Sequence, residues 1–110
     1  IAERLGKPII IEEFGYPRDG YSFSMESTTE HRDVYYGFIF KQVEQSRLSG
    51  GVIAGCNFWG WAGFAEPSVG HDYWRKGDPY TADPAQEPQG LFSVFHGDST
   101  VEIIRKYSTI

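Results

Sequence analysis

The sequence predicts an α/β fold in which parallel strands alternate with helices. Two short apolar runs, Pro8–Glu13 and Val52–Trp59, flank a segment with helical periodicity, Thr28–Leu48. Buried parallel strands have continuous apolar sequences of this kind, and strands that alternate with helices pair in parallel through helical crossovers. We therefore expect the two runs to be neighbouring strands whose carboxyl ends lie at the same edge of a sheet.

The first strand ends in two adjacent carboxylates, Glu12 and Glu13, which are followed by Phe14 and Gly15. In α/β barrels the catalytic groups stand at the carboxyl ends of the strands. A carboxylate here is therefore well placed to act as a nucleophile or as a general acid/base. Alternation along a strand points the two side chains to opposite faces, and this pattern alone does not choose between them. The alternative is a strand-end carboxylate held in a salt bridge.

The helix between the strands has clear start and stop signals. Ser27-x-x-Glu30 has the pattern of a capping box, and Ser49-Gly50-Gly51 ends the segment. One face carries large apolar side chains, which are Tyr36, Phe40 and Val43. We expect the charged side chains to lie mostly on the solvent side: His31, Arg32, Lys41, Glu44 and Arg47.

The second half of the chain has little periodicity before a final helix. Residues 60–89 contain several prolines and glycines, and a loop of that length in a compact domain is usually functional. Residues 90–95 are compatible with a short strand or a turn. Ser99-x-x-Glu102 predicts a second capping box, followed by a helix with an apolar stripe of Val101, Ile104 and Tyr107.

Composition excludes several classes of function. The net charge is −5 and no Lys/Arg cluster is present, whereas nucleic-acid binding needs a basic footprint. No apolar run approaches the roughly 20 residues of a membrane span. Cys56 is the single cysteine, and the three histidines lack the spacing of metal ligands. We therefore expect neither a metal nor another cofactor.

Three motifs resemble glycoside hydrolase family 5. Lys7–Gly15 resembles the seventh strand of that family, and Asn57–Gly63 resembles its eighth strand. Asp78–Tyr80 together with Asp83–Phe95 is similar to the closing loop of its endo-β-1,4-mannanase branch. The resemblance implies that residues 1–110 are a C-terminal fragment of a catalytic domain, formed by the last two βα units, seventh and eighth, of a (β/α)8 TIM barrel.

The resemblance also implies a catalytic role for Glu13. In this family the carboxylate just before the aromatic–glycine pair is the nucleophile, which leaves Glu12 a structural role. Retaining hydrolysis needs a second carboxylic acid roughly 5–5.5 Å away. In this family that acid follows an asparagine at the end of the fourth strand, which this chain does not contain. Asn57 precedes an aromatic residue and cannot replace it. We therefore expect the isolated fragment to be inactive.

Three tryptophans are candidate substrate contacts, because an indole face can stack on the apolar face of a sugar ring. Family position favours Trp59 as the platform under the sugar being cleaved, with barrel-top packing as the alternative. Trp61 either lines the cleft or packs the loop that follows. Trp74 is a candidate for a more distant sugar contact, although loop packing explains it more simply.

Together these features predict retaining hydrolysis of a β-1,4-linked mannan-type polysaccharide, such as mannan or glucomannan. The parent enzyme is expected to be secreted or periplasmic, with its export signal outside this chain. Two other functions stay open. One is a non-catalytic carbohydrate-binding barrel, which would lack the upstream Asn-Glu pair. The other is a small independent α/β interaction module, which would unfold cooperatively as a monomer.

Overall fold

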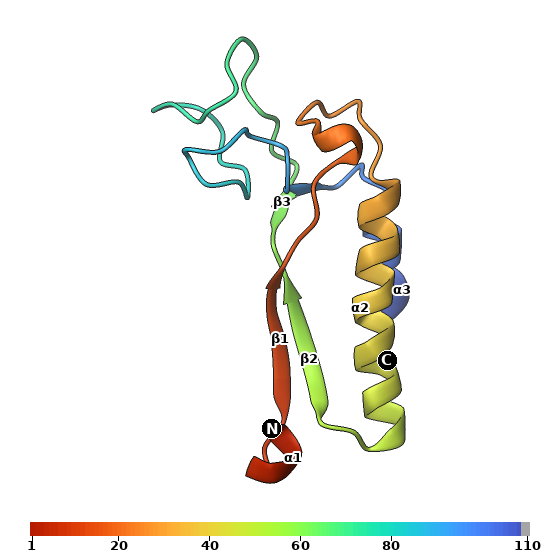
Figure 1. Cartoon of the computed structure of the whole chain (residues 1–110). Coiled ribbons are helices and arrows are strands. Elements are labelled where there is room, and N and C mark those ends of the chain that lie inside the picture. The colour runs from red at the N-terminus through yellow and green to blue at the C-terminus, as the bar shows by residue number, and fades with distance from the viewer. Residues whose placement is uncertain (109–110) are drawn as a thin grey trace.

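A computed structural model describes residues 1–108 and confirms the α/β alternation (Figure 1). Strands β1 and β2 lie side by side, pair in parallel and are connected through helix α2. Each predicted strand boundary differs from the observed one by a single residue. The elements in chain order are α1 (Ala2–Leu5), β1 (Ile9–Phe14), the 3-10 helix η1 (Asp19–Tyr21), α2 (Glu30–Ser49), β2 (Ile53–Phe58), β3 (Trp61–Gly63), β4 (Val94–Phe95) and α3 (Thr100–Ser108).

The core lies between the strands and the two long helices. Phe14, Tyr36, Val94 and Val101 are buried together, so β1, α2, β4 and α3 each contribute one residue. The Phe14 ring packs edge-on against Tyr36, with ring centroids 5.0 Å apart, and against Phe40 at 5.9 Å. The predicted apolar face of α2 is therefore confirmed at Tyr36 and Phe40.

The placement of Arg32 on the solvent side of α2 was wrong, because its side chain is fully buried. Arg32 lies one helical turn before Tyr36 and so shares the buried face. Its guanidinium donates hydrogen bonds to the carbonyl groups of Tyr16 at 2.8 Å, Leu91 at 2.9 Å and Ser93 at 3.0 Å. A buried charge needs such partners. Burial also lowers the pKa of Arg32 from its ordinary value.

The capping box predicted at Ser27 and Glu30 was also wrong. Helix α2 begins at Glu30, and the side chain of its N-cap residue, Thr29, makes no capping hydrogen bond. Asp19, which lies in η1 and outside the helix, caps α2 instead. Its carboxylate accepts hydrogen bonds from the backbone N–H groups of Glu30 at 2.8 Å and His31 at 3.2 Å. A carboxylate at this position also opposes the positive end of the helix dipole.

At the start of α3 the second capping box is not formed either. The Ser99 hydroxyl donates to the Asp33 carboxylate, and the Glu102 carboxylate accepts a hydrogen bond from Arg105 at 2.8 Å. The Thr100 hydroxyl also donates to Asp33 at 2.5 Å. The contacts of Ser99 and Thr100 with Asp33 link the first turn of α2 to the start of α3, where the sequence pattern had suggested bonds within one helix.

The long segment before α3 is ordered mainly by polar contacts and projects beyond the ends of β1 and β2 (Figure 1). Strand β3, which the sequence pattern did not predict, pairs in parallel with β4. The Asp83 carboxylate accepts hydrogen bonds from the N–H groups of Gly90 and Phe92, both at 2.7 Å, and from the Ser93 hydroxyl. The Gln89 amide donates to three carbonyl groups of residues 83–87. We call residues 64–93 the closing loop.

Candidate active site

The carboxyl ends of β1 and β2 meet at one edge of the sheet. Phe14 is in register with Phe58, and the N–H of Trp59 donates a hydrogen bond to the Phe14 carbonyl at 2.7 Å. Glu13 comes one residue before this pair in β1, and Trp59 comes one residue after it. The parallel register therefore brings these two predicted site residues to the same end of neighbouring strands.

Glu13 lies at an irregularity of β1. The register passes from Ile11 opposite Cys56 directly to Phe14 opposite Phe58, so two residues of β1 face a single residue of β2. Glu13 has a φ of 51°, in the left-handed region that non-glycine residues seldom occupy. Regular alternation is therefore interrupted here, and strand parity does not orient Glu12 and Glu13. Bulges and left-handed residues of this kind are concentrated at functional sites.

Both carboxylates at this strand end are open to solvent. Neither Glu12 nor Glu13 forms an ion pair within residues 1–108. A carboxylate without a cationic partner keeps its lone pairs available to a substrate. The salt bridge offered as the alternative role for Glu13 is therefore not observed in the described part of the chain.

The backbone of Trp59 is held from two sides. The buried Tyr36 hydroxyl donates a hydrogen bond to the Trp59 carbonyl at 3.1 Å, and burial raises the pKa of Tyr36, which keeps the hydroxyl protonated. A Cβ atom on Gly15 would lie 2.9 Å from the same carbonyl oxygen, so this close approach requires glycine. The Trp59–Gly60 peptide bond is cis. The indole remains 43% exposed and is accessible to a ligand.

Two buried arginines, which sequence analysis did not identify as site residues, hold the segment that follows the end of β1. Arg32 binds the Tyr16 carbonyl, three residues after Glu13. The Arg18 guanidinium donates to both carboxylate oxygens of Asp98 at 2.8 and 2.7 Å, which is a strong charge-assisted contact. Arg18 lies in a segment without periodicity, so the sequence carries no signal of its burial.

The other two predicted contacts lie farther along the chain. Trp61 is in β3 and is 55% exposed. Trp74 is half-buried in the closing loop, where its indole Nε1 donates to the Asp78 carbonyl at 3.1 Å. Its ring stacks on Tyr80, with centroids 5.3 Å apart. The structure thus shows the packing contacts of Trp74 that the simpler interpretation expected.

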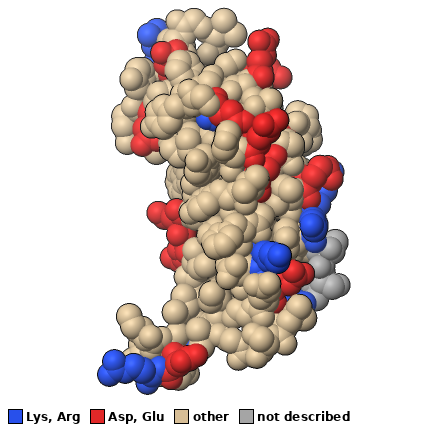
Figure 2. Space-filling model, turned by 45° about the vertical axis from the view of Figure 1, so that its right-hand side comes forward, with Lys and Arg blue, Asp and Glu red and all other residues tan. Residues whose placement is uncertain are grey.

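The described residues offer few features of other functional classes. Residues 1–108 contain no group of three or more potential metal ligands. No helix in this range combines the length and the apolar character that crossing a membrane requires. Lys and Arg side chains are scattered over the face shown in Figure 2 and do not gather into one basic patch. The strand-end carboxylate and its aromatic neighbours remain the strongest candidate site.

Comparisons with known proteins point in the same direction. A family model described as "GH family 5 beta-mannosidase-like" matches residues 1–110. Three solved structures of a glycoside hydrolase family 5 mannosidase from Rhizomucor miehei are similar to the chain, with 34%, 33% and 35% identity and TM-scores of 0.83, 0.83 and 0.81. Two are glutamate-to-alanine mutants, one of them in complex with mannosyl-fructose.

These similarities cover 96% of this chain and 27% of each mannosidase chain. The chain therefore spans about a quarter of the length of the enzymes it matches. No curated protein matches it.

Proposed function

The chain belongs to the β-mannosidase-like group of glycoside hydrolase family 5, and on this premise we propose that the protein containing it hydrolyses β-1,4-linked mannans with retention of configuration. The observation that carries the proposal is the position of Glu13. It lies on the left-handed, bulged end of β1, beside the strand end that bears Trp59. In this proposal residues 1–110 supply the seventh and eighth βα units, at the C-terminal end of a TIM-barrel catalytic domain.

Glu13 is the proposed nucleophile. Its carboxylate attacks the anomeric carbon and forms a glycosyl-enzyme, while a second carboxylic acid roughly 5–5.5 Å away protonates the leaving oxygen and then activates water. We place that second acid outside residues 1–110. The solvent exposure of Glu13 and the lack of an ion pair within residues 1–108 support this role. A preparation of the 110-residue chain alone should then release no sugar from mannan.

The tryptophans are the proposed substrate contacts. Trp59 is the platform for the sugar at the cleavage site, and its fixed backbone and half-exposed indole support this role. Trp61, which follows in β3 and is also exposed, lines the cleft beside it. Trp74 contributes farther out, in the closing loop.

We further propose that the substrate is a polysaccharide such as mannan or glucomannan, and that cleavage is internal to the chain. Exposed aromatic rings that continue from Trp59 to Trp61 fit a glycan that extends beyond the cleavage site. A polymer of this size is degraded outside the cell membrane, so the enzyme is expected to be secreted or periplasmic. Product analysis tests the mode of action: oligosaccharides of several lengths support internal cleavage, and mannose as the sole product argues against it.

Glu13→Gln in the full-length protein tests the catalytic assignment. Replacement of the nucleophile by its neutral isostere should reduce kcat by about a thousandfold or more, since removal of a catalytic nucleophile has effects of that order or larger. Binding of mannan oligosaccharides should persist. Glu12→Gln is the matched control and should retain most activity. Substantial turnover by the Glu13 variant, or an equal loss in both variants, would contradict the assignment.

A further inference from the structure

The closing loop carries a stacked aromatic pair away from the strand ends. The rings of Trp74 and Tyr80 have centroids 5.3 Å apart and an interplanar angle of 17°. Trp74 is half-buried, whereas Tyr80 is 79% exposed. Loop packing therefore accounts for Trp74 but leaves most of Tyr80 open to solvent. One face of the tyrosine ring rests on the indole, and the rest is accessible to a ligand.

The segment under this pair is held by Asp78. The Asp78 carbonyl accepts the indole N–H of Trp74 at 3.1 Å, and its carboxylate accepts hydrogen bonds from the Arg75 N–H at 2.7 Å and the Ser68 hydroxyl at 2.8 Å. Burial acts to raise the pKa of Asp78, but these hydrogen bonds together with the nearby charges of His71 and Arg75 outweigh it, so the pKa is lowered and the group stays ionised at neutral pH. The indole on which Tyr80 stacks is thus held by hydrogen bonds before any ligand arrives, which reduces the entropic cost of binding.

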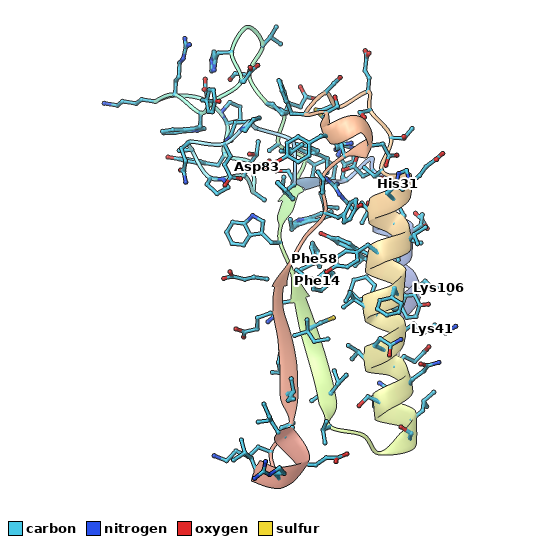
Figure 3. The ribbon with its side chains drawn as sticks, in the orientation of Figure 1. Phe14, His31, Lys41, Phe58, Asp83 and Lys106 are labelled. Atoms are coloured by element: carbon cyan, nitrogen blue, oxygen red, sulfur yellow. The ribbon has the colours of Figure 1, made fainter. Side chains whose placement is uncertain are left out.

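The closing loop is anchored directly beside the candidate site. A Cβ atom on Gly60 would lie 2.9 Å from the Cβ of Ala82, so the loop touches the residue that follows Trp59. The Ala82 N–H donates to the Ser93 hydroxyl at 3.0 Å, which fixes this contact. Figure 3 shows Phe14 and Phe58 near the carboxyl ends of the strands and Asp83, which follows Ala82, beyond them. Chain geometry through this contact places the Cα atoms of Tyr80 and Trp59 at most roughly 16 Å apart.

We propose that Tyr80, supported from behind by Trp74, forms a distal sugar-binding subsite on the same side as the catalytic strand ends. It takes the apolar face of one pyranose ring of a β-linked oligosaccharide whose cleaved bond lies near Trp59. The phenolic hydroxyl can exchange hydrogen bonds with sugar hydroxyl groups. This inference rests on the proposed function and deepens it, because it assigns a binding position to a sugar residue away from the cleaved bond.

The test compares a long and a short oligosaccharide by titration calorimetry. The full-length protein carries Glu13→Gln, so that neither β-1,4-mannopentaose nor β-1,4-mannobiose is consumed. Adding Tyr80→Ala should raise the Kd for mannopentaose about threefold to tenfold, the range expected for loss of one aromatic stacking contact. The Kd for mannobiose should change less than twofold. Tyr80→Phe, which keeps the ring, should retain at least half of the mannopentaose affinity.

A matched control is Phe64→Ala, which removes another exposed closing-loop ring that lies against His96 and has no place in the subsite. An unchanged mannopentaose affinity in Tyr80→Ala would overturn the subsite, as would equal weakening for both sugars or for the Phe64 control. The outcome for hydrolysis is separate. If protein with Glu13 intact hydrolyses mannopentaose but binding does not depend on Tyr80, the subsite is refuted and the proposed function stands. If binding depends on Tyr80 but protein with Glu13 intact does not hydrolyse mannopentaose, the subsite stands and the proposed function is refuted.

Discussion

The β1–α2–β2 unit and the closing loop are built by different physical means. The first buries large apolar side chains such as Phe14 and Tyr36 between strands and helices. The second, residues 64–93, is held by carboxylate and amide side chains that bind backbone groups, above all Asp83 and Gln89. Apolar burial leaves a periodic trace in a sequence, whereas polar contacts of this type leave none. The candidate site lies where the two regions meet.

Arg32 joins the two regions, so its removal should have the largest effect. Arg32→Ala leaves the carbonyl groups of Tyr16 and Ser93 without their side-chain donor, whereas the Leu91 carbonyl keeps the N–H of Arg18 at 3.0 Å. Each buried polar group left unpaired costs about 1–3 kcal/mol, so we expect the free energy of unfolding of the full-length protein to fall by about 3 kcal/mol in urea titrations. Arg32→Lys should recover less than half, because an ammonium group does not match the guanidinium geometry. A loss below about 1 kcal/mol, on the scale of one ordinary hydrogen bond, would show that the regions are held together elsewhere.

Asp83→Ala should break the closing loop and leave the β1–α2–β2 unit intact. The change removes the acceptor for the N–H groups of Gly90 and Phe92. Each buried donor left unpaired costs about 1–3 kcal/mol. Amide hydrogen exchange at these two residues should therefore accelerate about tenfold or more, while the amides of β1 keep their protection. Faster exchange in both regions would indicate that they unfold as one unit.

The smallest effect is expected at Asp19, whose contribution to the stability of the folded protein depends on pH. Hydrogen bonds from the Thr28 hydroxyl and from His31 hold the pKa of Asp19 well below its ordinary value of 3.8. A carboxyl group with a lowered pKa in the folded state stabilises that state above its unfolded pKa, and this stabilisation is lost as the pH falls through the folded-state value. Asp19→Asn should therefore lower the unfolding midpoint at pH 6. The difference from the unmodified protein should shrink as the pH falls below about 4. A difference that stays constant down to the lowest pH at which the protein folds would contradict the charged cap.

The sequence predicted those parts of the fold that depend on where apolar side chains lie. The two strands, their parallel pairing and the buried stripe of α2 follow from periodicity, and the shared edge of Glu13 and Trp59 follows from the topology. The burial of Arg32 could not be predicted, because its carbonyl partners lie 59 and 61 residues further along the chain at Leu91 and Ser93. Periodicity reports whether a position is covered, and it carries no information on which distant group supplies a hydrogen bond.

The local irregularities of the site were equally hidden. The left-handed conformation of Glu13 and the cap supplied by Asp19 both depend on contacts formed only after the chain has folded. The sequence signals there pointed to regular alternation and to a local serine cap. Both expectations describe an isolated strand or helix, and tertiary contacts replaced them.

The close approach of Gly15 to the Trp59 carbonyl limits how the candidate site can be redesigned. Any side chain at position 15 would place its Cβ atom 2.9 Å from that oxygen and would force the neighbouring strand end to move. Randomised libraries aimed at altered glycan preference should therefore keep position 15 fixed. Diversity is better introduced at Trp61 and Tyr80, where the rings are exposed.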